Sequence, residues 1–149
     1  MQPRAAFALL LCAMCIKNIE EIMFLPEWGD TNNFFIQMST AQVILAATIL
    51  TVVFAVIGLK TADKTVWPLA LITGSLMASA LANLILSVIQ FELMPGVLGG
   101  VLFLIPAAVL VFRSLDFTIG RSSLYTLAGL PFALTSGYLA LALSGFLVN

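Results

Sequence analysis

The sequence of 149 residues contains no histidine, only two cysteines and few charged residues. Without histidine, the chain has neither an imidazole acid–base catalyst nor a histidine-ligated metal site. Cys12 and Cys15 both lie in the first apolar run, where we expect them to be small buried fillers rather than a disulfide framework. Charged residues make up 9% of the chain and the net charge is −1, so nucleic acid has no basic surface to bind. We therefore expect no metal, no cofactor and no nucleic-acid partner.

Apolar residues dominate instead, at 62% of the chain, with a mean hydropathy of +1.15. A membrane-spanning helix needs about 20 mostly apolar residues. Runs of that kind cover residues 5–25, 40–59, 66–91, 95–112 and 123–148. The alternating pattern of a membrane β-barrel is absent, so the runs are expected to be helices. The sequence predicts an all-α integral membrane bundle of about five transmembrane helices, as one domain over residues 1–149.

The basic residues predict the orientation. With five crossings, five of the six basic residues fall on one side of the membrane: Arg4, Lys60, Lys64, Arg113 and Arg121. The opposite side carries Glu27, Asp30 and Glu92 without any Lys or Arg. Because Lys and Arg gather in cytoplasmic loops, we expect a cytoplasmic N-terminus and Asn149 on the opposite side. The lipid bilayer is the partner that this pattern implies.

Small residues and prolines indicate how the helices pack. Gly74, Ala78 and Ala82 recur every fourth residue in the third run. Such spacing lets helices approach closely in lipid, so we expect the third helix near the centre of the bundle. Pro26 is expected at the end of the first span, and Pro106 and Pro131 are expected to kink the fourth and fifth.

The polar stretch of the first span is the main candidate for a functional site. Lys17 precedes Glu20 and Glu21 by three and four residues, with Asn18 beside it. These spacings place opposite charges side by side on a helix. Charges inside a span are costly and usually face a partner or a wet cavity. One carboxylate is left in surplus, which makes Glu20 and Glu21 the candidate catalytic residues.

Other spans deliver polar side chains to a similar depth, in the outer half of the membrane: Gln42, Asn83, Ser87 and Gln90. Together with Lys17 and Asn18 they form a predicted binding or structural cluster. In the purely structural interpretation, the cluster is an ion pair with interhelical hydrogen bonds. The functional interpretation is a pocket that opens outward or into lipid, where a carboxylate acts as a general acid or base or binds a cation.

The motif of residues 17–21, followed by Phe24, Pro26 and Trp28, resembles the first motif of the HXXEE membrane domain family. That family is named for a histidine, two free positions and two glutamates. A second similarity runs from Asn83 to the Pro-Gly pair at 95–96, so that the resemblance covers residues 10–113. Lys17 and Ser87 stand where the family histidines are expected. The resemblance implies a membrane-embedded site of carboxylates and histidines without a settled activity.

Three functions follow from these patterns. The first is a non-catalytic subunit or scaffold that keeps the fold and packs against other membrane subunits, lipids or pigments. The second is a membrane-embedded enzyme, hydrolase- or isomerase-like, that acts on a lipid or isoprenoid-like molecule through Glu20 or Glu21. The third is a small cation transporter that uses the surplus carboxylate.

Overall fold

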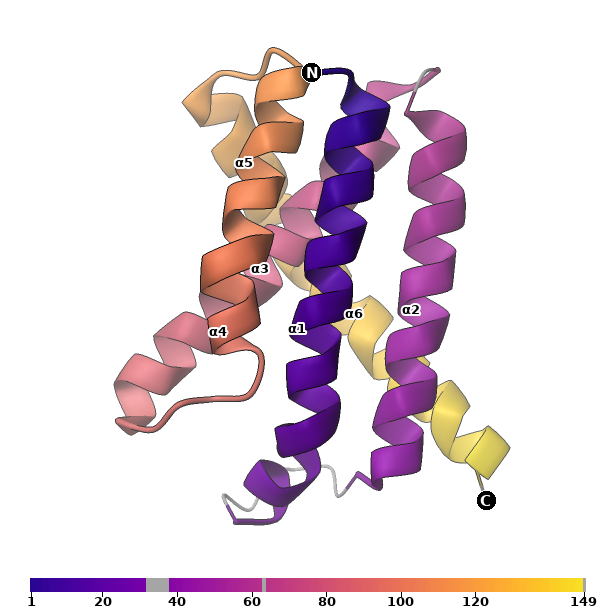
Figure 1. Ribbon diagram of the computed structural model, residues 1–149, viewed down its shortest axis with the longest axis vertical. Helices are drawn as coiled ribbons and strands as arrows, with labels where there is room; N and C mark the ends of the chain where they lie inside the picture. The colour runs from indigo at the N-terminus through magenta and orange to yellow at the C-terminus, as the bar shows by residue number, and fades with distance from the viewer. Residues whose placement is uncertain (32–37, 63, 149) are drawn as a thin grey trace.

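The described part of the chain, residues 1–31, 38–62 and 64–148 of a computed structural model, is helical apart from short connections. The segments are α1 (Pro3–Thr31), α2 (Thr40–Thr61), α3 (Val66–Gln90), α4 (Val97–Gly99), the π-helical η1 (Gly100–Leu104), α5 (Ile105–Ser114) and α6 (Ile119–Val148). α4, η1 and α5 follow one another without a break and form the fourth long helical segment of the chain, which we call the fourth span (Figure 1). The predicted all-α fold is confirmed.

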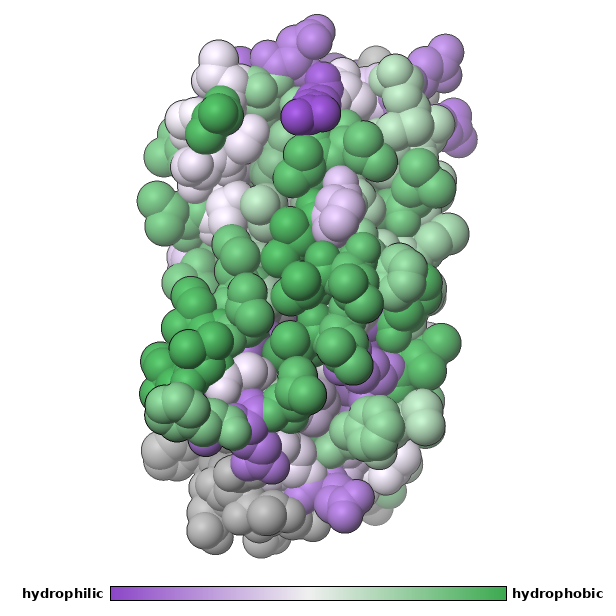
Figure 2. Space-filling view, turned by 60° about the vertical axis from the view of Figure 1, so that its left-hand side comes forward, coloured by the Kyte–Doolittle hydropathy of each residue, from purple (hydrophilic) through white to green (hydrophobic). Residues whose placement is uncertain are grey.

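Four of these segments are long and apolar enough to cross a membrane: Thr40–Thr61, Val66–Gln90, Val97–Ser114 and Ile119–Val148. α1 is 29 residues long and runs beside them, but it carries Lys17, Glu20 and Glu21. α1 can therefore form a fifth crossing only if ion pairs and hydrogen bonds within the protein compensate these charges. Figure 2 shows apolar side chains over the middle of the molecule and polar ones gathered toward its two ends. The protein is an integral membrane protein.

The chain begins and ends at opposite ends of the bundle (Figure 1). The start of α1, the end of α2, the end of α5 and the start of α6 share the N-terminal end. Arg4, Lys60, Arg113 and Arg121 belong to these helix ends. This arrangement fits an odd number of crossings, although Asn149 itself lies outside the described residues.

α3 occupies the centre of the bundle, as predicted, and contacts every other helical segment of the described chain. Its closest neighbour is α6. A Cβ atom on Gly74 would lie 2.2 Å from the backbone oxygen of Tyr125, and one on Gly129 would lie 2.3 Å from the backbone nitrogen of Ser75. The predicted close helix contact is confirmed at Gly74. Ala78 is also buried, whereas Ala82 is half-buried.

α1 and α6 extend several residues beyond the predicted apolar runs. α1 continues through Pro26 to Thr31. Pro26 has no backbone N–H and so removes one hydrogen bond from the helix. The turn that follows it is stabilised by Trp28, which packs against Met94 and Val97. α6 begins at Ile119 rather than at residue 123, with the Thr118 hydroxyl accepting a hydrogen bond from the Arg121 N–H at 3.4 Å.

The kink expected at Pro106 takes the form of a π-helical turn. The N–H of Ile105 donates to the carbonyl of Gly100, five residues earlier. A proline ring clashes with the carbonyl four residues before it in a regular α-helix. A wider turn directly before Pro106 accommodates the ring, because π turns place one more residue in the loop of each hydrogen bond.

Candidate functional site

Glu20 of α1 holds the first turn of the fourth span. Its Oε1 accepts a hydrogen bond from the backbone N–H of Leu98 at 3.2 Å, and its Oε2 accepts one from the N–H of Gly99 at 2.7 Å. The N–H of Val97 donates to the carbonyl of Met94 at 3.2 Å, and the N–H of Gly100 to that of Gly96 at 2.9 Å. All four N–H groups at the start of this helix are thus satisfied.

The fourth span needs such help because it is short. Its 18 residues cover about 27 Å, slightly less than the hydrocarbon core of roughly 30 Å. Its first turn therefore starts within or close to the apolar layer, where unsatisfied N–H groups are costly. A carboxylate at a helix N-terminus also interacts favourably with the helix dipole. The surplus carboxylate of the sequence motif thus serves as a helix cap.

The carboxylate of Glu21 contacts side chains rather than backbone N–H groups. Its Oε1 lies 2.5 Å from Nζ of Lys17, one turn earlier on the same helix, so the predicted ion pair forms. The same oxygen accepts a hydrogen bond from Nδ2 of Asn83 at 3.2 Å. Lys17 exposes only 6% of its surface and Asn83 only 8%. A buried charge is tolerated when it is paired and hydrogen-bonded, which is the arrangement found here.

Asn83 and Ser87 connect this pair to the 91–96 connection. Nδ2 of Asn83 also donates to the carbonyl of Pro95 at 3.1 Å, and Oγ of Ser87 accepts from the N–H of Met94 at 2.7 Å. The two side chains are four residues apart on α3, so they share a face. Together with Glu20 and Glu21 they fasten α3, α1 and the start of the fourth span. We call Lys17, Glu20, Glu21, Asn83 and Ser87 the latch.

Two glycines let the backbone reach the latch. Gly96 has a φ of +88°, and a Cβ there would lie 2.8 Å from Oε1 of Glu21 and 2.9 Å from Nδ2 of Asn83. A Cβ on Gly99 would lie 2.8 Å from the Cα of Lys17. Side chains at either position would push the fourth span away from α1.

The remaining residues of the predicted cluster lie elsewhere. Asn18 donates through Nδ2 to Oγ1 of Thr51 on α2 at 3.0 Å. Gln42 forms a capping box with Ser39 at the start of α2. Gln90 is exposed at the last residue of α3. Of the residues predicted at this depth, Asn83 thus hydrogen-bonds to Glu21 and Ser87 to Met94, whereas no hydrogen bond joins Asn18, Gln42 or Gln90 to a carboxylate in the described residues.

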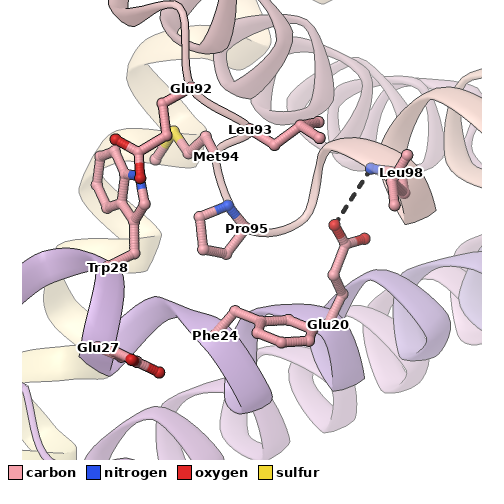
Figure 3. Close-up of a pocket in the computed structure, with 9 residues that line it drawn as sticks. All are labelled: Glu20, Phe24, Glu27, Trp28, Glu92, Leu93, Met94, Pro95 and Leu98. Carbon is pink, nitrogen blue, oxygen red and sulfur yellow. Dashed lines mark hydrogen bonds between the residues drawn. The ribbon is translucent and has the colours of Figure 1, made fainter.

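Two cavities border the latch. Figure 3 looks into a pocket of about 350 Å³ between α1 and residues 92–98, with Glu20 and Phe24 on one side, Trp28 on the other and Pro95 between them. Glu27 and Glu92 also line this pocket. Within residues 1–31, 38–62 and 64–148, however, no three acidic or cysteine side chains come together in a way that could hold a metal ion.

The second cavity, of about 220 Å³, lies inside the bundle between α1, α2, α3 and α6. Lys17, Asn18 and Glu21 border it on one side. Three serines, Ser75, Ser79 and Ser136, line it from α3 and α6, and the rest of its wall is apolar. These serines were not predicted as site residues from the sequence; their hydroxyl groups within apolar runs were the signal that could have identified them, as for Thr51.

The two cysteines differ from the expectation. Cys12 and Cys15 are both exposed on α1 rather than buried. Their side chains point away from the core that Met14 and Ala13 enter, because the four residues spread around the helix. Their place in an apolar run therefore reflects contact with the bilayer.

A comparison with known proteins identifies the family of the chain. Residues 8–111 match the family model described as "Protein of unknown function with HXXEE motif". No curated protein and no solved structure matches the chain. The two motif glutamates fall on Glu20 and Glu21, and Lys17 stands at the histidine position. The chain belongs to the HXXEE family.

Proposed function

We propose that this chain is a non-catalytic membrane subunit or scaffold, in which the HXXEE-position residues fasten the fold. One observation carries the proposal: each carboxylate of the motif accepts hydrogen bonds from groups of its own chain. Glu20 receives two backbone N–H groups of the fourth span, and Glu21 receives Lys17 and Asn83. A general acid or base has to exchange a proton with a substrate, whereas these contacts engage both oxygens of Glu20 and Oε1 of Glu21 within the protein itself.

The lysine supports the same proposal. The side chain at position 17 is a lysine that pairs with Glu21, and it offers no imidazole for proton transfer. The bundle also leaves many large apolar side chains exposed along its middle, as Figure 2 shows. These faces are available to lipid or to the apolar helices of partner subunits. We further propose that the basic end of the bundle is cytoplasmic.

Isolation of the protein in a mild detergent tests the proposal. A scaffold is expected to bring a protein partner in fixed stoichiometry, and that partner should remain bound to Glu20→Gln, whose amide oxygen still accepts a hydrogen bond from the fourth span. Recovery of the chain alone, with one small apolar molecule bound to it, would contradict a scaffold role.

A second candidate function rests on the internal cavity. An enzyme acting on a lipid or isoprenoid-like substrate would place the substrate's polar group beside Lys17, Asn18 and Glu21 and its chain along the apolar wall. Organic extraction of the purified protein, followed by mass spectrometry, tests this alternative. If the protein is such an enzyme, a defined small molecule should co-purify with it. That molecule should be lost from Ser79→Phe, because the phenyl ring would fill the cavity beside the serines.

A further inference from the structure

A separate groove opens at the basic end of the bundle, between α5 and α6. α5 packs on α1 and α3, whereas α6 packs on α2 and α3. The two helices therefore diverge from the turn that joins them, as Figure 1 shows. Between them lies a groove of about 500 Å³, with Met77 and Leu81 of α3 as its floor. This volume falls within the roughly 300–1,000 Å³ typical of ligand pockets.

The body of the groove is apolar. Val109 and Phe112 line it from α5, and Leu127 lines it from α6. The groove faces outward from the bundle, since Leu127 exposes 69% of its surface and Ile119, at the groove's end, exposes 88%. In a bilayer, the apolar part of such a groove is in contact with acyl chains, because it opens on the outer face of the bundle.

The mouth of the groove is basic and rich in hydroxyl groups. Arg113, in the last turn of α5, lines it and is exposed. The guanidinium of Arg121 lies 4.3 Å from the centre of the Phe117 ring, and Phe117 is part of the groove wall. Ser123 adds a hydroxyl group at the start of α6. Asp116 is the acidic residue of the connecting turn, so this corner carries a net positive charge.

We propose that this groove binds an anionic phospholipid. One acyl chain lies along Met77, Leu81 and Leu127, and the phosphate is bound by Arg113, with Arg121 and Ser123 beside it. Guanidinium groups bind phosphate through two parallel hydrogen bonds, and basic pockets between membrane helices select acidic headgroups. This site lies at the opposite end of the bundle from the latch and does not depend on the proposed scaffold role.

Lipid competition measured by native mass spectrometry tests the proposal. The purified protein, in a neutral detergent, is mixed with equal amounts of phosphatidylglycerol and phosphatidylcholine. We expect preferential retention of phosphatidylglycerol. Arg113→Gln should lower that preference by about fivefold, the factor for one lost cation–headgroup contact, and Arg113→Lys should lower it less.

Lys60→Gln is the matched control, because it removes one positive charge from the same end of the bundle outside the groove. It should leave the preference unchanged. Ser123→Trp, which places an indole at the mouth, should reduce retention of both lipids. An unchanged preference in Arg113→Gln, or an equal loss in Lys60→Gln, would overturn the proposal. Displacement of the lipid by glycerol phosphate at equal concentration would also overturn it, since the groove would then bind phosphate without the chain.

Discussion

Two neighbouring carboxylates of this protein have different tasks because of where each points. Glu20 reaches the start of the fourth span, and Glu21 turns to Lys17 and Asn83. The Lys17–Glu21 pair could be predicted from the sequence, because the four-residue spacing is local to one helix. The contact between Glu20 and Leu98 joins residues 78 positions apart, and no periodicity of the sequence encodes it.

Removing the cap should destabilise the fold. Glu20→Ala leaves the N–H groups of Leu98 and Gly99 without their acceptor, at a cost of about 1–3 kcal/mol. Glu92→Ala, in the same pocket but exposed, should change the free energy of unfolding by less than about 0.5 kcal/mol. Denaturant titration in mixed micelles measures both. Equal stabilities of the two variants would show that Glu20 does not cap the span.

Gly96 should tolerate no side chain. Gly96→Ala combines a positive φ with a Cβ that would lie 2.8 Å from Oε1 of Glu21, so a loss of about 1–3 kcal/mol is expected. Gly137→Ala is the control, since a Cβ there meets nothing within 4 Å. It should be neutral or stabilise by up to about 1 kcal/mol. The same titration compares them, and a harmless Gly96→Ala would mean that the 91–96 connection can move away from α1.

At the scale of the helices, the short fourth span explains the latch. A helix that starts within the apolar layer needs acceptors for its first N–H groups, and α1 and α3 supply the side chains that organise this start. The apolar runs predicted the helices themselves. Their boundaries depended on tertiary contacts, such as the packing of Trp28 on Met94 that extends α1 beyond Pro26. The π turn before Pro106 could not be predicted either, because the proline was its only sign in the sequence.

The crossing of α3 and α6 should be the most sensitive packing contact. Gly74→Ala places a Cβ 2.2 Å from the backbone oxygen of Tyr125, which cannot rotate away, so the helices must separate. We expect a loss of about 1–3 kcal/mol. Gly120→Ala, on the same helix pair but with open space around it, should have little effect. Thermal unfolding in detergent distinguishes the two, and similar melting temperatures would contradict a tight α3–α6 contact.

At the scale of the whole molecule, the bundle has a basic end, an apolar middle and an end that carries Glu27 and Glu92. The segregation of charge could be predicted from the sequence, since it follows from counting spans. The groove between α5 and α6 could not, because it depends on the angle at which these helices diverge.

Cysteine labelling tests the orientation. In a chain with Cys12 and Cys15 replaced by serine, Lys64→Cys should react with an impermeant thiol reagent from the cytoplasmic side. Glu92→Cys should react from the opposite side, because α1, α2 and α3 separate the N-terminus from the 91–96 connection and each is expected to cross the membrane once. Labelling of both positions from one side would contradict the topology.

The latch itself is tested most directly by a double-mutant cycle between Lys17 and Glu21. Lys17→Met breaks an ion pair within the bundle and should cost about 3–5 kcal/mol, because Glu21 loses its cationic partner and is left with Asn83 alone. Lys17→Met combined with Glu21→Met strands no charge, and Asn83 still donates to Pro95, so the double variant should be much more stable than the first. We predict a coupling free energy of at least about 1.5 kcal/mol from denaturant titration in mixed micelles. Single-variant effects that add to within about 0.5 kcal/mol would instead show two independent, solvated side chains and no structural latch.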